Sequence, residues 1–317
     1  MKSIVIALLV SSALLAQTKS DPPIVLNASY NYNGSTLTPQ LGPIAVAAHT
    51  KIGDPGSRFE MTIQVPEEGW ITSFDHISLN GSPDTDPASL DLFVDVTTPD
   101  HTDLFCQGRE ERIVSYGHER PAWPHVDGFG YHVRAHQRLH VVVTLANPGA
   151  KAIGWDSLSV VLDFQPSSSG AFRRDAYPLW FDVKGCGESD FDLKPGTSIF
   201  SGTFKAPLDG QLVAVQPAFG KYVDNIRLEN HTRNDLLVNV ESHSDGSFPV
   251  QRPAEGIEWR LAQGDLVTIG ATYHNPQKTD AKAAATGMAL GLFVPTDGNA
   301  LSNLEKKPAA TDPPAAR

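Results

Sequence analysis

Short stretches in which apolar and polar residues alternate recur along most of the chain. Each is rich in Val, Ile, Leu, Phe or Thr and is bounded by Gly, Pro, Asn or Asp; the clearest read RFEMTIQVP, SLDLFVDVTT, LHVVVTLAN, LSVVLDF, QLVAVQP, DLLVNV, DLVTIGATY and MALGLFVP. A period of two with turn residues at both ends predicts β-strands. The stretch TDAKAAATG predicts one helical turn at most. The pattern therefore predicts an all-β protein.

Two parts of the chain carry the same pattern. Residues 59–74 (FEMTIQVPEEGWITSF) align without a gap on residues 200–215 (FSGTFKAPLDGQLVAV), and an Asn-Pro pair at 147–148 recurs at 275–276. In both parts an apolar strand follows that pair. Repeats of about 120 residues, each with about eight short strands, are typical of β-sandwich and jelly-roll domains. The sequence therefore predicts two tandem eight-stranded antiparallel jelly-roll domains.

The composition outside the repeats sets the predicted boundaries. A Lys next to the first Met, followed by an apolar run that starts at Ile4, is typical of a secretory signal peptide. The last residues are rich in Pro and Ala and lack apolar periodicity, which predicts disorder. We therefore divide the chain into a signal peptide (1–19), an N-terminal extension (20–56), a first jelly-roll domain (57–166), a linker (167–177), a second jelly-roll domain (178–296) and a disordered tail (297–317).

Charge and hydropathy narrow the class of partner. The formal net charge is -11, and because binding to phosphate backbones is driven by Lys and Arg, nucleic acid is not expected as a partner. After residue 19 no segment approaches the roughly 18 uninterrupted apolar residues that mark a membrane-spanning helix. We expect a secreted protein, extracellular or periplasmic, whose partner is an extracellular ligand or protein.

Two cysteines and four sequons fit a secreted chain. Cys106 and Cys186 either form one disulfide or remain two buried thiols, and the sequence leaves both possibilities open. The N-x-S/T triplets are candidate glycosylation sites if the source is a glycosylating eukaryote, and they begin at Asn27, Asn33, Asn80 and Asn230.

Motifs for common catalytic chemistry are absent from the sequence, but histidines are concentrated in one region. There is no G-x-S-x-G elbow, P-loop, dinucleotide fingerprint, H-E-x-x-H or C-x-x-C. Six of the 11 histidines lie between residues 101 and 140: His101, His118, His125, His132, His136 and His140. Imidazole is the commonest side-chain ligand of transition metals, and His132 and His140 flank a predicted turn, VRAHQRL, that would let their side chains approach. The same residues also fit solvated loop and surface positions.

The segment IVSYGHERPAWPHVDGFGYHVRAHQRLHVVVTLANPGA resembles the first domain of the copper type II, ascorbate-dependent monooxygenases, the family of the peptidylglycine α-hydroxylating and dopamine β-type enzymes. The segments FKAPLDGQLVAVQPAFGKYVDNIRLEN, GDLVTIGATYHNP and TGMALGLFV follow the order of that family's second domain. The resemblance covers residues 57–295 and implies a double jelly roll with one copper in each domain, which is a stronger statement about fold than about function.

At the metal positions the chain departs from that family. The resemblance implies a His-x-His pair and a Met around the second copper, and the matching residues here are Ala218, Gly220 and Met288. The regions that would supply the histidines of the first copper read ASLDLFVDV and TLANP, without histidine. A thioether alone is a weak, neutral ligand. We therefore interpret Met288 as a remnant ligand position that serves as a core residue.

Three functions follow from these observations. The first is a secreted, non-catalytic protein with a binding or structural role and no cofactor, because the family's frame is kept while its copper ligands are lost. The second is a copper- and ascorbate-dependent monooxygenase with relocated ligands drawn from His118, His125, His132, His136, His140 and His274. The third is a glycan-binding module or a glycan amidase, for which the architecture alone argues.

Overall fold

The computed structural model describes residues 23–26, 29–81, 91–117, 123–171, 173–186, 190–219, 222–242 and 249–298. The predicted signal peptide and nearly all of the predicted tail lie outside these residues, as do Asn27, His118 and Gly220. Within the described residues the regular structure is β-strand, apart from one 3-10 turn at Ser167–Ser169 (η2). The prediction of an all-β protein is confirmed.

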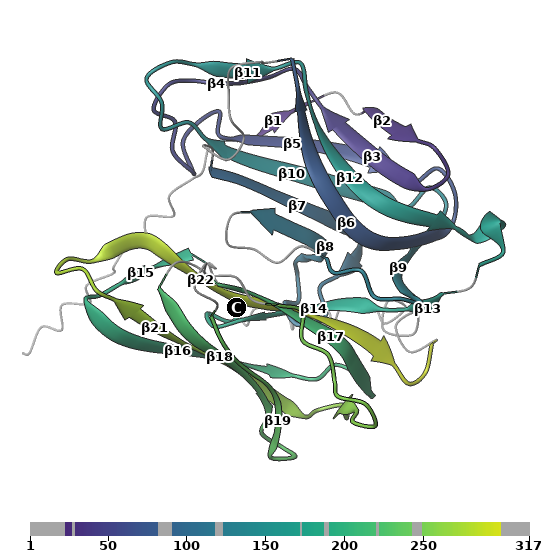
Figure 1. Cartoon of the computed structure of the whole chain (residues 1–317). Helices are drawn as coiled ribbons and strands as arrows, with labels where there is room; N and C mark the ends of the chain where they lie inside the picture. Colours follow the sequence, from purple (N-terminus) through teal and green to yellow (C-terminus); the bar gives the residue numbers. More distant parts are fainter. Residues whose placement is uncertain are drawn as a thin grey trace, which may run out of the picture.

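The first half of the described chain, residues 23–176, forms the upper part of the molecule in Figure 1. Its strands are β1 (Ile24–Val25), β2 (Ser29–Tyr32), β3 (Thr36–Leu41), β4 (Ile44–Val46), β5 (Arg58–Gln64), β6 (Gly69–Asn80), β7 (Asp91–Thr102), β8 (Glu110–Gly117), β9 (Phe129–Val133), β10 (Arg138–Ala146), β11 (Ile153–Trp155), β12 (Ser157–Pro166) and β13 (Arg174–Asp175).

The second half, residues 177–298, forms the lower part. Its strands are β14 (Tyr177–Asp182), β15 (Asp190–Leu193), β16 (Gly196–Lys205), β17 (Gly210–Phe219), β18 (Val223–Asn230), β19 (Asp235–Glu241), β20 (Trp259–Leu261), β21 (Leu266–Asn275) and β22 (Ala281–Pro295).

The strands of the two halves pair in the same order. In the first half one sheet contains the order β5-β10-β7-β8 and the other contains β9-β6-β12-β3. In the second half the corresponding orders are β16-β21-β18-β19 and β20-β17-β22-β14. The pairs within these orders are antiparallel, whereas the two short added strands β1 and β13 run parallel to β5 and β9. The repeat read from the sequence is therefore also a repeat of strand pairing.

Equivalent side chains make equivalent contacts in both halves. Gly69 and Gly210 begin matching strands, and a Cβ atom at either position would collide with a backbone carbonyl and with a Phe ring on the neighbouring strand. Asn147 donates from Nδ2 to the carbonyl four residues later and accepts at Oδ1 from the N–H two residues later. Asn275 makes the same two hydrogen bonds. These contacts explain why the Gly and the Asn recur in the two repeats.

One sheet of the second half is buried on both faces. Its strands β14, β17 and β22 lie between the first half and the β16–β21–β18 layer (Figure 1). Along β22, Leu290 and Leu292 belong to the apolar cluster of the first half, whereas Ala289 and Phe293 belong to the apolar cluster of the second half. A strand that is buried on both faces reads as a continuous apolar run, which is what MALGLFV shows. The two halves therefore share a core.

The helical turn predicted for TDAKAAATG is wrong. Strand β22 begins at Ala281, and its first part pairs with β15, placing Asp190 opposite Thr286 and Phe191 opposite Ala285. Alanine favours helix by well under 1 kcal/mol per residue over most other residues, so a partner strand overrides that preference.

Segments predicted as an extension and a linker also contribute strands. Within residues 20–56, β3 pairs with β12 in the core of a six-stranded sheet, where Leu37 and Leu41 are fully buried. Within residues 167–177, β13 pairs with β9. The described residues of both segments thus belong to the folded first half, except Tyr177, which begins β14.

Candidate metal positions and the junction between the halves

Met288 lies at the junction between the two halves. It is on β22, which runs between β14 and β17 in its sheet. Its side chain is 1% exposed and belongs to the apolar cluster of the first half. Across the strand pair its direct partner is Ala218 on β17. The two described positions that the resemblance assigns to one copper are therefore neighbours in the fold.

The residues at this position do not fit a copper ion. Ala218 offers no donor atom, and the thioether of Met288 is enclosed in an apolar cluster that also contains Trp180 and Leu290. A buried cation needs nitrogen, thiolate or oxygen ligands to offset its loss of water, and one neutral sulfur does not supply them. Met288 therefore acts here as packing between the halves.

His132 and His140 stand on strands of different sheets. His132 on β9 pairs with Trp70 on β6, whereas His140 on β10 pairs with Thr62 on β5 and with Thr97 on β7. The turn that joins β9 to β10 carries the chain from one sheet to the other instead of folding it back as a hairpin. His132 and His140 therefore lie in different sheets, on either side of this turn.

Each of these histidines has carboxylate partners of its own. His132 Nε2 lies 2.9 Å from Glu68 Oε1. His140 Nδ1 lies 3.0 Å from Glu110 Oε2, and its Nε2 lies 3.4 Å from Glu60 Oε2. Because the two nitrogens of one ring point in different directions, Glu60 and Glu110 cannot join His140 around a single ion. The ring instead links β10 to its neighbour β5 through Glu60 and, across β7, to β8 through Glu110.

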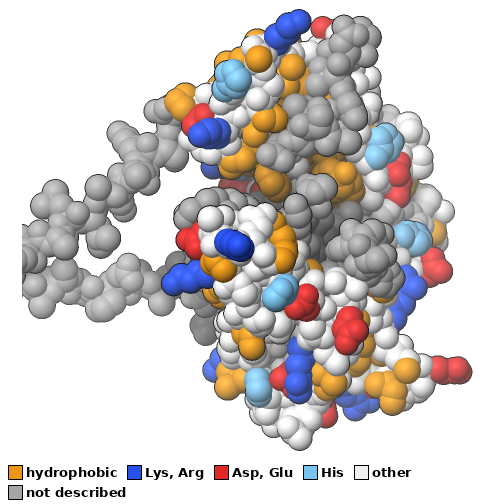
Figure 2. All heavy atoms as spheres, turned by 60° about the vertical axis from the view of Figure 1, so that its left-hand side comes forward, with side chains coloured by type: hydrophobic (Ala, Val, Ile, Leu, Met, Phe, Trp, Pro, Cys, Tyr) orange, Lys and Arg blue, Asp and Glu red, His pale blue; other side chains and the backbone are white. Residues whose placement is uncertain are grey.

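The remaining described histidines are scattered. His125 Nε2 lies 3.0 Å from Asp127 Oδ1, and His274 Nδ1 lies 3.4 Å from Thr197 Oγ1. His136 occupies the turn before β10 with a φ of 66°. Figure 2 shows the histidines of one face separated from each other by other side chains. In the described part of the chain, no group of three or more His, Cys, Asp or Glu side chains is arranged to hold a metal ion.

A buried polar cluster inside the first half did not emerge from the sequence. The hydroxyl of Tyr131 donates to Glu111 Oε2 over 2.6 Å, and His101 Nδ1 lies 3.0 Å from the same oxygen. Glu111 is only 3% exposed, and Tyr131 is fully buried. Burial raises the pKa of Tyr131 well above its usual range, and the charge of Glu111 raises it further. The tyrosine hydroxyl therefore stays a hydrogen-bond donor to the carboxylate.

The alternation of buried and exposed residues along β8 could have indicated this cluster from the sequence. Glu111 occupies the same side of the strand as the buried Ile113, where a carboxylate would otherwise be left without water. A buried carboxylate is tolerated when donors surround it. A Glu in the apolar phase of a predicted strand would have suggested a buried partner.

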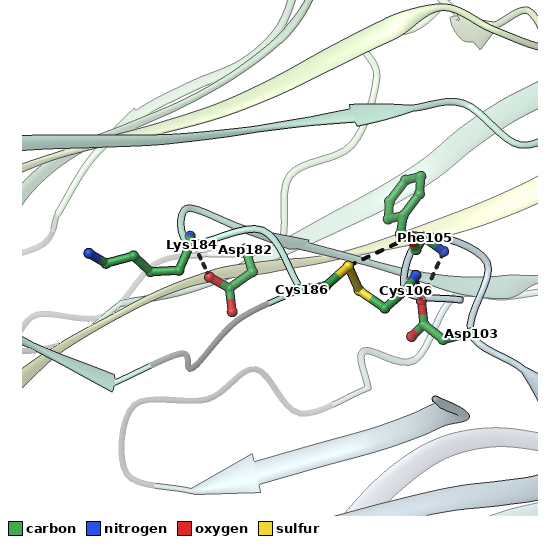
Figure 3. The surroundings of a disulfide bond; sticks show 6 residues. All are labelled: Asp103, Phe105, Cys106, Asp182, Lys184 and Cys186. Carbon is green, nitrogen blue, oxygen red and sulfur yellow. Dashed lines mark hydrogen bonds between the residues drawn. A yellow bond between two sulfur atoms is a disulfide. The ribbon is translucent and has the colours of Figure 1, made fainter. Parts of the chain in front are cut away.

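The Cys106–Cys186 disulfide is confirmed. It joins the loop between β7 and β8 of the first half to the segment after β14 of the second half, with an S–S distance of 2.12 Å (Figure 3). Asp103 Oδ1 accepts hydrogen bonds from the N–H groups of Phe105 and Cys106, which shapes the loop. The ring of Phe105 lies against the apolar cluster of the second half. Covalent and apolar contacts thus fix this loop across the junction.

The sequons differ in accessibility. Asn33 and Asn80 are exposed at the ends of strands. Asn230 is fully buried, and its Nδ2 donates to Asp265 Oδ2 over 2.7 Å. A glycan would need that nitrogen and would not fit in the core, so Asn230 is not an acceptor in the folded chain. The prediction for Asn230 is corrected on this ground.

Comparison with known proteins gives no family. No family model matches the chain, and no curated protein matches it. A candidate secreted protein from Eubacterium rectale aligns with 76% of this chain and 69% of its own at 10% identity, with a TM-score of 0.26. A second from Parabacteroides distasonis covers 85% and 92% at 9% identity, with a TM-score of 0.21. TM-scores this low carry no argument about fold or function.

Within the described residues, no helix is long and apolar enough to cross a membrane.

Proposed function

We propose that this protein is a secreted, non-catalytic protein with a binding or structural role, built from two tandem jelly-roll domains of the copper type II monooxygenase type. The equal strand orders of the two halves support the tandem jelly rolls. The register that sets Ala218 opposite Met288 supports descent from that family, because the resemblance assigns both positions to one metal. The predicted signal peptide and the disulfide support secretion.

The packing of Met288 is the observation that best supports a non-catalytic protein. A copper that activates oxygen needs imidazole ligands and access for the co-substrate. Here Met288 is 1% exposed in a cluster of apolar side chains. Its partner on the neighbouring strand is Ala218, which cannot bind a metal through its side chain. The order of the strands is kept, and Met288, at the former metal position, now packs between the two halves.

The junction also supports a role that depends on a fixed arrangement of the halves. Besides the shared core and the disulfide, Trp180 Nε1 donates to the carbonyl of Arg112 over 2.7 Å, and Arg112 lies 5.1 Å from the Trp180 ring centre. Two halves held at fixed positions present one rigid surface. A rigid surface lowers the entropy cost of binding a partner.

Copper binding tests this proposal. Protein produced with copper and dialysed against a weak chelator is expected to retain far less than one copper per chain by elemental analysis. The matched variant Ala218→His/Gly220→His restores the His-x-His pair that the resemblance assigns to these positions and is expected to gain one copper per chain. A further Met288→Leu substitution is expected to weaken that binding, since it removes the third ligand.

Two results would contradict the proposal. Near-stoichiometric copper in the unmodified protein, with a type II spectrum that disappears in a His132→Ala/His140→Ala variant, would favour the monooxygenase with relocated ligands. A double-histidine variant that folds like the unmodified protein by near-UV circular dichroism but gains no copper would contradict descent from the copper family.

A further inference from the structure

The chain contains the tripeptide Asn-Gly-Ser twice, beginning at Asn33 and at Asn80. Because the three residues are the same, their intrinsic reactivity in an unfolded chain is the same. Asparagine followed by glycine is the step at which a backbone nitrogen most easily attacks the side-chain amide, since glycine has no Cβ to block the approach. Any difference between the two sites in the folded protein therefore comes from their surroundings.

At Asn33 the side-chain carbonyl is held by three donors. Asn33 lies in the exposed loop between β2 and β3, at the upper right of Figure 1. Its Oδ1 accepts from Ser35 N–H over 2.9 Å, from Ser35 Oγ over 3.0 Å and from Thr36 N–H over 2.8 Å. Gly34 has a φ of 85°, and the space where a Cβ would stand is open to 4 Å. The amide carbon is thus polarised and exposed.

We propose that Asn33 is a site of self-catalysed deamidation. The Gly34 nitrogen loses its proton to solvent base and bonds to Cγ of Asn33, which puts negative charge on Oδ1. The three donors stabilise that charge in the way an oxyanion hole does. Solvent then returns a proton to Nδ2, the Cγ–Nδ2 bond breaks, and the nitrogen leaves as ammonia. Water opens the resulting cyclic imide at one of its two carbonyls, giving aspartate or isoaspartate, with no change of oxidation state.

At Asn80 the surroundings oppose the same reaction. Asn80 ends β6, and its backbone carbonyl accepts from Asp156 N–H over 2.9 Å. The Nδ2 that would leave donates to Ser157 Oγ over 3.3 Å. The Asp156 carboxylate packs against Gly81, 2.3 Å from where a Cβ would stand. A negative charge next to the Gly81 peptide disfavours the deprotonated nitrogen that must attack.

The modification would add negative charge to one hairpin of the first half. In the aspartate product a carboxylate replaces an amide oxygen as acceptor for the same three donors, so the loop keeps its hydrogen bonds and strengthens them. In the isoaspartate product the backbone gains one carbon, which lengthens the loop between β2 and β3. A glycan on Asn33 would prevent both, because Nδ2 would no longer leave as ammonia.

The test compares the two sites within one molecule. Full-length protein from a host that does not glycosylate is incubated folded in mildly alkaline buffer, and peptide mapping by mass spectrometry follows conversion of each asparagine. We expect Asn33 to convert at least about tenfold faster than Asn80, which corresponds to about 1.4 kcal/mol in barrier. In denaturant the two rates are expected to be equal.

The variant Ser35→Ala tests the donors directly. It removes the hydroxyl donor and keeps both N–H donors. The rate of Asn33 conversion in the folded variant is divided by the rate of the same variant in denaturant. We expect this ratio to fall several-fold relative to the unmodified protein. Near-UV circular dichroism checks that the variant folds as the unmodified protein does. Equal rates at Asn33 and Asn80 in the folded protein would overturn the proposal. So would faster conversion in Ser35→Ala, because the donors would then protect the amide.

Discussion

Replacing Cys106 and Cys186 together by serine measures how much the disulfide stabilises the fold. The bond joins residues 80 apart in sequence. Closing a loop of about 80 residues lowers the entropy of the unfolded chain enough to stabilise the fold by about 4.5 kcal/mol. We therefore expect the free energy of unfolding of the double variant to fall by about 4 kcal/mol, a large part of the stability of a typical domain.

A second variant separates the cross-link from the packing beside it. Phe105→Ala keeps the disulfide but removes a ring whose centre lies 5.1 Å from that of Phe181 and 4.7 Å from that of Phe204. Full burial of a Phe side chain stabilises a fold by about 1.5 to 3 kcal/mol, and Phe105 is partly exposed, so we expect a loss of about 2 kcal/mol.

Urea unfolding followed by tryptophan fluorescence distinguishes the two effects. The disulfide acts on the unfolded chain, so the unmodified protein in dithiothreitol should coincide with the double-serine variant, and both should show a steeper dependence on urea than the oxidised protein. Phe105→Ala should lower the midpoint and leave the steepness unchanged. A loss below about 1 kcal/mol in the double variant would refute the reasoning, as would a double variant that still responds to dithiothreitol.

Two further substitutions test buried charges. Tyr131→Phe takes a donor from the buried Glu111 and should lower the free energy of unfolding by about 1 to 3 kcal/mol in urea, whereas an unchanged midpoint would contradict the donor role. Burial raises the pKa of Asp265, but hydrogen bonds from Ala262 N–H, Asn230 and Arg233 outweigh burial and hold that pKa below its usual range. A lowered folded pKa stabilises the fold above the unfolded pKa of about 4 and loses that effect as the pH falls through the folded pKa. Thermal unfolding of Asp265→Asn should therefore depend less on pH in this acid range than that of the unmodified protein, and equal slopes would contradict this assignment.

Strands whose side chains alternate between core and solvent were predictable from the sequence. Only one face of such a strand is buried, so apolar residues recur at every second position. On β10 every second residue from Leu139 to Leu145 is fully buried, and the sequence shows the same period. The strand β3 was not predicted, because Pro39 has no N–H to donate to a neighbouring strand and its presence argues against a central strand. The start of β22 was not predicted either, because its alanines carry no strand preference and depend on pairing with β15.

The junction was less predictable than the strands. The two cysteines are visible in the sequence, but their pairing depends on which loops of the two halves meet, and local patterns do not determine that. The burial of Met288 depends on side chains of the first half, which cover β22 from the other half of the chain. Local patterns contain no information about contacts between surfaces that are distant in sequence.

The position of β22 has a consequence for how the chain matures. This strand ends the described fold, yet it lies in the middle of the sheet that both cores share. A polypeptide that emerges from the ribosome N-terminus first leaves the apolar flank of its first half without a cover until residues 281–295 follow. Exposed apolar surface of this kind attracts chaperones and other unfinished chains. The apolar clusters on the two faces of this sheet are therefore completed only after residues 281–295 have been made.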